Sequence, residues 1–232
     1  MTLSETYIKT NCRDCKCKSG PFLRLTTEQM QKVDQHRTEL HYNKGEILCK
    51  QGTFVSSLIF VKKGFVKVFL ENGDDPTILS VVKAGSFIGL QSLYGENIFH
   101  YSAEAMTDTE ICLTDINTFR ELILENSNFS KGIIEILNED LIKSYSRLFS
   151  LTQKHINGRF AELMLFMSDT LYIENPFKLT ISRKDMADLI STSPESISRL
   201  MSEFKEQEII TAKGHIIEIL DISRLESISK RG

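Results

Sequence analysis

The hydrophobic pattern changes character about half-way along the chain. In the first half, short apolar and β-branched segments alternate with glycines, and residues 65–69 alternate in part between apolar and polar positions, as a half-buried strand does. The pattern predicts strands over residues 57–61, 65–70, 77–82 and 110–113. Asn72-Gly73 predicts a hairpin turn, because both residues tolerate positive φ. Short strands separated by turn residues predict a β-sandwich, roll or barrel at about 20–120.

A helical period then replaces the alternation. Residues 131–157 contain no proline, and Gly132 near the start is the only helix-breaking residue among them. Apolar residues recur at steps of three or four, at Ile134, Leu137, Leu141, Tyr145, Leu148 and Leu151. They predict one helix of about 25 residues, roughly 38 Å long. Such a helix can pack on the core of its own domain, but a heptad-like repeat of this length favours a dimer interface.

In the last third of the chain, a further helical pattern covers residues 158–172. The residues that follow it predict two short helices joined by a polar turn. The first helix covers residues 183–190, and Pro194 then opens the second, with Ser193 as its N-cap. The apolar face of the second helix consists of Ile197, Leu200, Met201 and Phe204, and its polar face of Glu195, Ser198, Arg199 and Ser202. Two helices with this turn and a polar outer face are typical of a helix-turn-helix.

A β-hairpin wing is predicted next, because residues 208–212 and 215–220 flank Lys213-Gly214. From Leu151 onward the chain has eleven basic and twelve acidic residues, so this half is not broadly basic. The alternative is a small helical domain in which Glu195 and Arg199 form an ion pair one turn apart. The pattern as a whole favours DNA binding.

Composition and charge exclude several classes of protein. The 232 residues are 41% hydrophobic and 25% charged, which is typical of a globular chain with room for two modest domains. The net charge of −3 argues against a general nucleic-acid coat, although it allows a small basic recognition surface. No apolar run has the length of a membrane span, and the first residues lack a signal-peptide pattern. We therefore expect a cytoplasmic protein with no membrane partner.

Together these segments resemble the Crp/Fnr regulators. The family's winged helix is resembled by residues 182–190, 193–200 and the Lys-Gly wing, and its cyclic-nucleotide-type β-roll by residues 43–47, Gly52, 58–68 and 84–89. The resemblance covers about 20–225 and implies an α+β fold: an N-terminal antiparallel, jelly-roll-like β-roll, a long dimerisation helix and a C-terminal winged helix-turn-helix. The implied divisions are a cysteine-containing arm (1–19), a sensor domain (20–125), the dimerisation helix (126–157) and a DNA-binding domain (158–232).

The resemblance also implies a homodimer that regulates transcription, binds a palindromic double-stranded operator and contacts RNA polymerase. The family's Glu-x-x-x-Arg reading positions fall on Glu195 and Arg199, beside Ser198. A carboxylate accepts from cytosine N4, and an arginine donates to guanine O6 and N7. Pro194 replaces the arginine of the cyclic-AMP receptor branch, which implies Fnr-like, TTGA-type half-sites. Ser193, Ser202 and Lys213 complete the candidate DNA contacts.

The candidate effector pocket departs from the cyclic-AMP pattern. Family members that bind cyclic AMP have Gly-Glu, whose Glu meets the ribose, and Arg-Ser, whose Arg meets the phosphate. Here these positions read Gly89-Leu90 and Tyr101-Ser102, with Gln91 adjacent. A buried phosphate without its arginine lacks a charge partner, which is costly. We do not expect cyclic AMP to bind, and another small ligand in the roll stays open.

The cysteines offer a different sensor. Cys12, Cys15 and Cys17 lie within six residues, and thiols in a reducing compartment are metal, redox or buried-thiol candidates. Fnr-type oxygen sensors hold an iron–sulfur cluster with an N-terminal cysteine trio and one cysteine of the roll, where Cys112 falls here. The C-x2-C-x-C spacing is tighter than in those sensors. An iron–sulfur cluster, zinc, a thiol switch and unligated structural thiols all stay open, and Cys49 is expected to be a buried small hydrophobe.

Two rival classes are less favoured. A β-roll that regulates a protein partner would leave the winged helix without a role. A thiol or metal enzyme built on Cys12 and Cys15 would need a surrounding thioredoxin-like βαβ unit, and no Ser-His-Asp, P-loop or His-Glu-x-x-His motif occurs. We therefore expect a regulator and not an enzyme.

Overall fold

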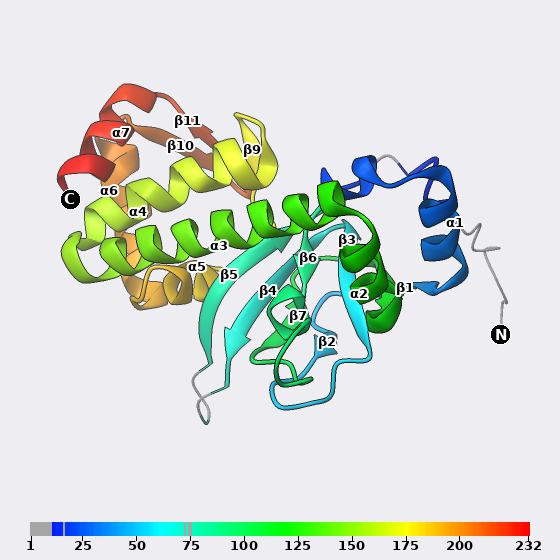
Figure 1. The fold of residues 1–232 in the computed structure, drawn as a ribbon. Coiled ribbons are helices and arrows are strands. Elements are labelled where there is room, and N and C mark those ends of the chain that lie inside the picture. Colours follow the sequence, from blue (N-terminus) through cyan, green and yellow to red (C-terminus); the bar gives the residue numbers. More distant parts are fainter. Residues whose placement is uncertain (1–10, 16, 72, 74–75) are drawn as a thin grey trace, which may run out of the picture. The chain divides into compact units, whose positions relative to one another are not determined.

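A computed structural model describes residues 11–15, 17–71, 73 and 76–232 (Figure 1). The described residues form two compact units. The first contains the described residues up to Glu71 together with Val81–Glu139, and the second contains those within 72–80 together with Asp140–Gly232.

The first unit contains most of a β-roll of two four-stranded sheets, with strand orders β1-β8-β3-β6 and β2-β7-β4-β5, and the first residues of β5 fall in the second unit. The strands are β1 (Arg37–Tyr42), β2 (Ile47–Cys49), β3 (Ser57–Lys63), β4 (Phe65–Leu70), β5 (Thr77–Lys83), β6 (Phe87–Ile88), β7 (Ser102–Ala105) and β8 (Thr109–Asp115). The four strands predicted from the sequence are confirmed as β3, β4, β5 and β8. Strands β4 and β5 are neighbours, Gly73 between them has φ +59°, and Asn72 lies outside the described residues.

Strand register brings three side chains of the later site together. β8 lies between β1 and β3 and pairs antiparallel with both, so Cys112 stands opposite Glu39 on one side and Phe60 on the other. The turn between β3 and β4 requires glycine at Gly64. Its φ is +90°, and a Cβ there would lie 2.6 Å from Thr109 Oγ1.

The helices of this unit are η1 (Pro21–Arg24), α1 (Thr27–Gln35), η2 (Leu90–Ser92), α2 (Ile116–Glu125) and the first part of α3 (Ser127–Gln153). An aromatic cluster joins three of them, η1, α2 and α3, to the roll. The rings of Phe119 and Phe129 are fully buried with centroids 5.2 Å apart, and Phe22 of η1 lies 5.6 Å from Phe87 of β6. Edge-to-face and offset contacts of this kind add to the burial of apolar surface, so the cluster fixes η1, α2 and α3 to the sheet.

Helix α3 is 27 residues long, about 40 Å at 1.5 Å per residue. The sequence predicts this helix over 131–157, and both ends are wrong. Asn126 ends α2 and its side chain accepts the Phe129 N–H at 3.0 Å, which starts α3 at Ser127. At the other end, extended backbone at His155 starts a new helix, so Asn157 belongs to α4 (Ile156–Leu165).

The second unit contains a three-stranded sheet and four further helical segments. They are η3 (Phe166–Tyr172), β9 (Phe177–Lys178), α5 (Arg183–Leu189), α6 (Pro194–Glu206), β10 (Ile210–Lys213), β11 (Ile216–Ile219) and α7 (Ile222–Arg231). The predicted helix over 158–172 continues α4 but changes to a π-helix at η3. The predicted wing is confirmed as β10–β11, except that Lys213 pairs with Ile216 and the turn residues are Gly214 and His215. The sequence pattern did not predict β9, which pairs with β11, or α7.

Candidate functional site

Both helices of the helix-turn-helix begin at a side-chain N-cap, and the second is also held by its buried apolar face. Ser182 and Asp185 form a capping box at the start of α5. Ser193 accepts the Ser196 N–H at 3.2 Å, which confirms it as the N-cap of α6. Ile197, Leu200 and Phe204 are fully buried, and the Phe204 ring meets Phe160 of α4 edge-on at 4.9 Å. These contacts fix the orientation of α6, so its polar face is presented outward.

The polar face of α6 carries the predicted reading residues. Glu195, Arg199, Ser193 and Ser202 are exposed, Ser198 is half-buried, and Lys213 is exposed on the wing. Among the ion pairs of the described residues, that of Arg199 joins Glu203 at 3.7 Å, one turn further on, and not Glu195. Exposed pairs of this kind contribute little, so both side chains can reach another partner.

The Glu195 carboxylate is held as an acceptor. Its own backbone N–H and the Ser193 hydroxyl hydrogen-bond to it and hold the pKa of Glu195 below its usual value. The group is therefore ionised at neutral pH, which is the form that accepts from an amino group such as cytosine N4.

Arg183 lies on the same surface and was not among the predicted contacts. Its Nη1 donates to Ser198 Oγ at 3.1 Å, and the Ser198 hydroxyl donates to the Pro194 carbonyl at 3.0 Å. The Ser198 proton is therefore used within the helix, while the exposed guanidinium of Arg183 adds positive charge beside Ser198. The sequence pattern does not mark Arg183 as a contact, because it reaches this surface through the packing of α5 against α6.

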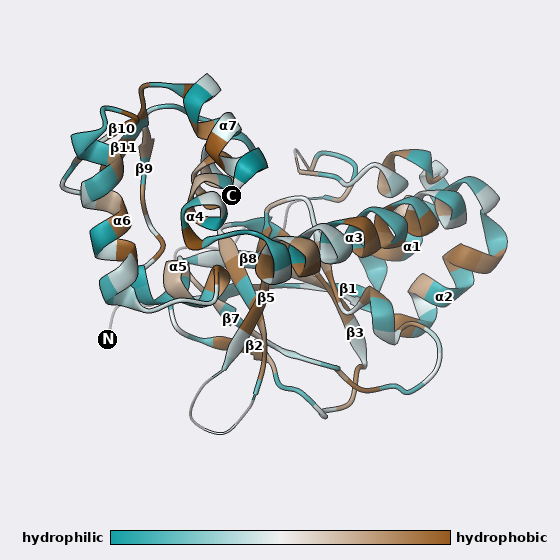
Figure 2. Ribbon diagram, turned by 90° about the vertical axis from the view of Figure 1, so that its left-hand side faces the viewer, coloured by the Kyte–Doolittle hydropathy of each residue, from teal (hydrophilic) through white to brown (hydrophobic). Residues whose placement is uncertain are grey.

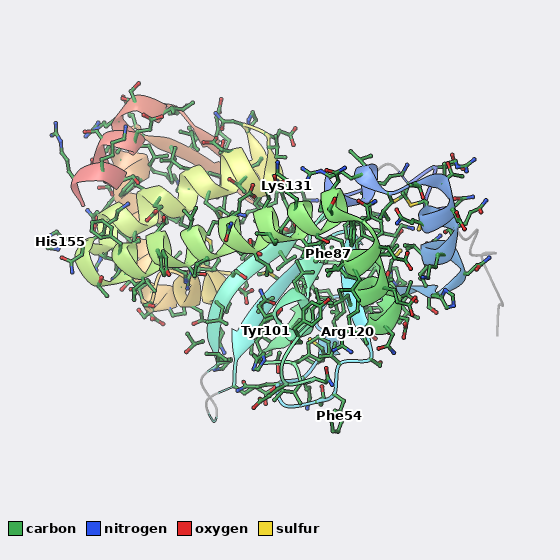
Figure 3. All side chains as sticks on the ribbon, in the orientation of Figure 1. Phe54, Phe87, Tyr101, Arg120, Lys131 and His155 are labelled. Atoms are coloured by element: carbon green, nitrogen blue, oxygen red, sulfur yellow. The ribbon has the colours of Figure 1, made fainter. Side chains whose placement is uncertain are left out.

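The candidate effector residues of the roll do come together, and they satisfy one another. Tyr101 projects from the roll where Figure 3 labels it. Its hydroxyl accepts the Gly89 N–H at 2.9 Å and donates to Gln91 Oε1 at 2.9 Å. Leu90 is buried, as is Ser102, whose hydroxyl accepts the Gln51 N–H at 2.9 Å. A phosphate bound here would have to displace the Tyr101 hydroxyl from Gly89, and no arginine stands at position 101 to compensate.

The N-terminal cysteines and the roll cysteine line one small cavity. Cys12, Cys15 and Cys112 border a space of about 30 Å³, together with the cationic side chains Lys18, Arg37 and Lys62. Cys17 adjoins it, with its Sγ 3.3 Å from Cys15 Sγ. Cys49, as expected, is buried elsewhere in the roll, on β2. The structure thus brings the four predicted thiols to one region.

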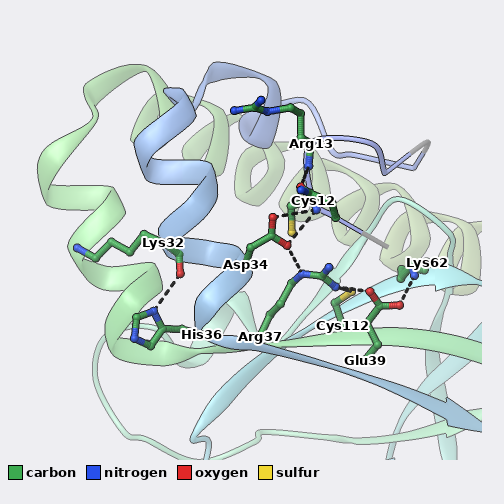
Figure 4. A network of polar contacts seen from close by, with 10 residues as sticks. Cys12, Arg13, Lys32, Asp34, His36, Arg37, Glu39, Lys62 and Cys112 are labelled. Atoms are coloured by element: carbon green, nitrogen blue, oxygen red, sulfur yellow. Dashed lines mark hydrogen bonds and ion pairs between the residues drawn. The ribbon is translucent and has the colours of Figure 1, made fainter. Parts of the chain in front are cut away.

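An ion network, the Arg37 network, anchors this region (Figure 4). It consists of Asp34, Arg37, Glu39, Lys62 and Cys112. Arg37 Nε lies 2.8 Å from Asp34 Oδ1 and its Nη1 2.5 Å from Glu39 Oε1. The same Nη1 donates to Cys112 Sγ at 3.4 Å, and Lys62 Nζ lies 2.5 Å from Glu39 Oε2. The Asp34 carboxylate also accepts the Cys12 N–H at 3.0 Å, so the arm is tied to the roll.

Burial and these partners set the protonation of the network. Burial raises the pKa of Cys12 to about 12, and a hydrogen bond with Asp34 adds to that rise. Burial also raises the pKa of Cys17 to about 12, supported by its hydrogen bond with Cys15, and raises the pKa of Cys112 against the pull of Arg37. For Glu39, burial alone would raise the pKa, but hydrogen bonds from Lys62 and Arg37 outweigh it and the pKa is lowered. These three cysteines are therefore thiols at neutral pH and Glu39 is ionised.

This arrangement does not fit an iron–sulfur cluster. Cluster ligation needs thiolates that converge on the iron atoms. Within the described ranges, no three His, Cys, Asp or Glu side chains are arranged to hold a metal ion. Cys112 is engaged by Arg37, and Cys15 faces Cys17 instead of Cys112.

Comparison with known proteins agrees with both halves of the fold. The family model described as "Cyclic nucleotide-binding domain" matches residues 39–126, and the one described as "Crp-like helix-turn-helix domain" matches 158–228. The chain belongs to the Crp/Fnr family. It is a transcription regulator with a DNA-binding helix-turn-helix, and the family resemblance read from the sequence is confirmed.

Curated relatives match along almost the whole chain. "Transcriptional activator protein Anr" of Pseudomonas protegens is 24% identical over 222 residues, which cover 92% of this chain and 90% of the relative. "Electron transport regulator A" of Shewanella oneidensis is 25% identical over 228 residues, with 94% and 90% covered. FixK2 of Bradyrhizobium japonicum shares the fold, with a TM-score of 0.77, 22% identity and coverage of 83% of this chain and 96% of that structure. In the part of this Crp/Fnr chain that the structure describes, no helix combines the length and apolarity of a membrane span.

We expect cyclic AMP to give no saturable heat of binding in titration calorimetry, because Tyr101 occupies the Gly89 N–H and neither anchor of the nucleotide is present. The double variant Leu90→Glu, Tyr101→Arg supplies both groups and should bind more tightly than the wild type. A micromolar dissociation constant for the wild type would contradict this account of the pocket.

Proposed function

We propose that the protein is a homodimeric, sequence-specific regulator whose α3 helices form the dimer interface. Its functional divisions are the cysteine-containing arm (1–19), the sensor domain (20–125), the dimerisation helix (126–157) and the winged helix-turn-helix (158–232). Palindromic double-stranded DNA is its ligand, and RNA polymerase is the protein partner that the family resemblance implies.

The exposed apolar stripe of α3 supports the dimer. It consists of Ile134, Leu141, Ile142, Tyr145, Leu148 and Phe149, which are between 48% and 63% exposed in the single chain. Figure 2 shows hydrophobic residues recurring along this helix. Ile134, Leu141 and Leu148 repeat at intervals of seven, with Tyr145 four residues after Leu141, which is the spacing of a two-helix seam. A row of large apolar side chains left in water marks an interaction surface.

The single observation that carries the DNA-reading proposal is the outward polar face of α6. Glu195 accepts from cytosine N4 and Arg199 donates to guanine O6 and N7, which fits a TTGA-type half-site. Ser198 lies between them in the chain, and Ser193, Ser202 and Lys213 border this face as contacts to the operator. In a two-fold dimer the two α6 helices would enter major grooves about 34 Å apart, which requires a palindromic site.

The sensory role is assigned to the roll and the N-terminal cysteines. Cyclic AMP is disfavoured by the Tyr101–Gly89 contact. The relatives bear names that refer to electron transport and to fumarate and nitrate reduction, which supports a signal linked to redox state. Cys12, Cys15 and Cys112 line the roll cavity, and cysteine thiols are side chains that an oxidant can modify.

Leu141→Asp is expected to convert the dimer into a monomer, because it would place an unpaired charge in the proposed seam. Sedimentation velocity at micromolar concentration measures this directly. Leu124→Asp, at an exposed leucine of α2 outside the stripe, is the matched control and should remain dimeric. A wild type that sediments as a monomer would rule out the α3 interface.

Arg199→Ala is expected to weaken binding to a TTGA-type palindrome by about 1–3 kcal/mol and to relax selectivity at the guanine step. Fluorescence anisotropy with the palindrome and with single-base variants separates the two effects. Lys205→Ala, an exposed cation in the last turn of α6, is the control and should leave selectivity unchanged. Equal weakening on every sequence would show that Arg199 contacts phosphate and does not read the base.

A further inference from the structure

The four thiols around the roll cavity divide into two kinds. Cys112 is buried and accepts a hydrogen bond from Arg37, and Cys12 is buried with its backbone N–H held by the Asp34 carboxylate. Cys15 and Cys17 are half-buried, and their sulfur atoms lie 3.3 Å apart. Cys12 and Cys112 are therefore held by residues of the roll, whereas Cys15 and Cys17 face each other.

The facing pair is close to bonding geometry. A disulfide S–S bond is about 2.05 Å long, so the two sulfur atoms need to approach by only about 1.3 Å. Two cysteines separated by one residue are held near each other by the chain itself. Reagents in solution also reach these half-buried thiols before the buried Cys12, Cys49 and Cys112.

We propose that Cys15 and Cys17 form a reversible disulfide, with hydrogen peroxide or a related hydroperoxide as the oxidant. The proposal rests on the sensory role proposed above for the N-terminal cysteines and names its chemistry. It is also consistent with the poor fit of the four thiols to a cluster. A disulfide needs only Cys15 and Cys17, so the sulfur atoms of Cys12 and Cys112 do not have to lie near them.

The reaction takes place in two balanced steps. One cysteine sulfur attacks a peroxide oxygen, the O–O bond breaks, and one water leaves as a sulfenic acid forms. The second thiol then attacks the sulfenic sulfur, the S–S bond forms, and the hydroxyl leaves with the thiol proton as a second water. The two thiols lose two electrons, and hydrogen peroxide is reduced to two waters.

Oxidation would change the wall of the cavity that the Arg37 network borders. Cys15 lines that cavity with Lys18, Arg37 and Lys62, and the arm is joined to Asp34 through Cys12. Forming the disulfide would shorten the distance between Cys15 and Cys17, and so change the backbone of the arm next to Cys12, which Asp34 holds. The arm and the roll are thus the elements whose packing the disulfide would alter.

The test uses the full-length protein, purified without oxygen and assayed first for iron and visible absorbance. Stoichiometric hydrogen peroxide is then added, free thiols are alkylated after unfolding, and the protein is analysed by intact mass and peptide mapping. Before alkylation we expect a loss of about 2 Da, and after it two fewer alkyl groups than on the reduced protein, one disulfide joining Cys15 to Cys17 in the peptide map, and reversal by dithiothreitol. Cys12, Cys49 and Cys112 should be recovered as alkylated thiols.

Matched variants keep the result decisive. Cys15→Ser and Cys17→Ser should each abolish the mass loss, and Cys49→Ser should retain it. A disulfide involving Cys12 or Cys112, or oxidation to sulfinic acid without a disulfide, would overturn the proposal. An iron-containing, coloured protein whose four thiols resist peroxide and alkylation would overturn it in favour of metal ligation.

DNA affinity, measured in the same samples by anisotropy, separates this proposal from the proposed function. If the disulfide carries the signal, oxidation should change the dissociation constant of the wild type by about fivefold or more, and should not change that of Cys15→Ser. A disulfide that forms without altering DNA affinity would support the chemistry and contradict the sensory role. A fivefold response that persists in both serine variants would support the sensory role and overturn the Cys15–Cys17 pair as its origin.

Discussion

The burial of Arg37 is the constraint on which the arrangement of the sensor region depends. Its side chain is only 2% exposed, and an unpaired guanidinium in such a place would be strongly destabilising. Asp34 and Glu39 must therefore stand on either side of it, and Lys62 balances the second carboxylate. Because Asp34 also holds the Cys12 N–H, the same ion network that satisfies a buried cation decides where the cysteine arm lies.

Local signals account for the parts of the fold that the sequence predicts. Short apolar segments between turn residues specify four strands of the roll, β3, β4, β5 and β8, and the Ser193–Pro194 start of α6 needs only its own cap and φ preference. The ends of α3 were mistaken because they depend on specific capping geometry at Asn126 and on a change of backbone direction at His155, neither of which interrupts the apolar period. Strand β9 has only two residues, and its existence depends on pairing with β11.

In the candidate sites too, the sequence predicts residues that share one element, and it does not predict contacts that depend on tertiary packing. Glu195 and Arg199 were predictable because one helix face carries both, whereas Arg183 joins that face only through the packing of α5 against α6. The resemblance to Fnr-type sensors placed the cysteine trio near Cys112, and the structure does so. It could not show that Arg37 would engage Cys112 or that Tyr101 would close over Gly89, since both contacts join separate segments of the roll.

The central claim, that the Arg37 network holds the cysteine arm on the roll, is tested most directly by the alkylation rates of Cys12 and Cys112 in the native protein. In Arg37→Gln, losing hydrogen bonds between charged groups worth about 1.5–3 kcal/mol should raise both rates by about ten- to a hundredfold. Arg120→Gln, which removes an arginine bonded to the Leu93 carbonyl and Asn97, should leave them unchanged. Equal rates in folded Arg37→Gln and wild type would contradict the account.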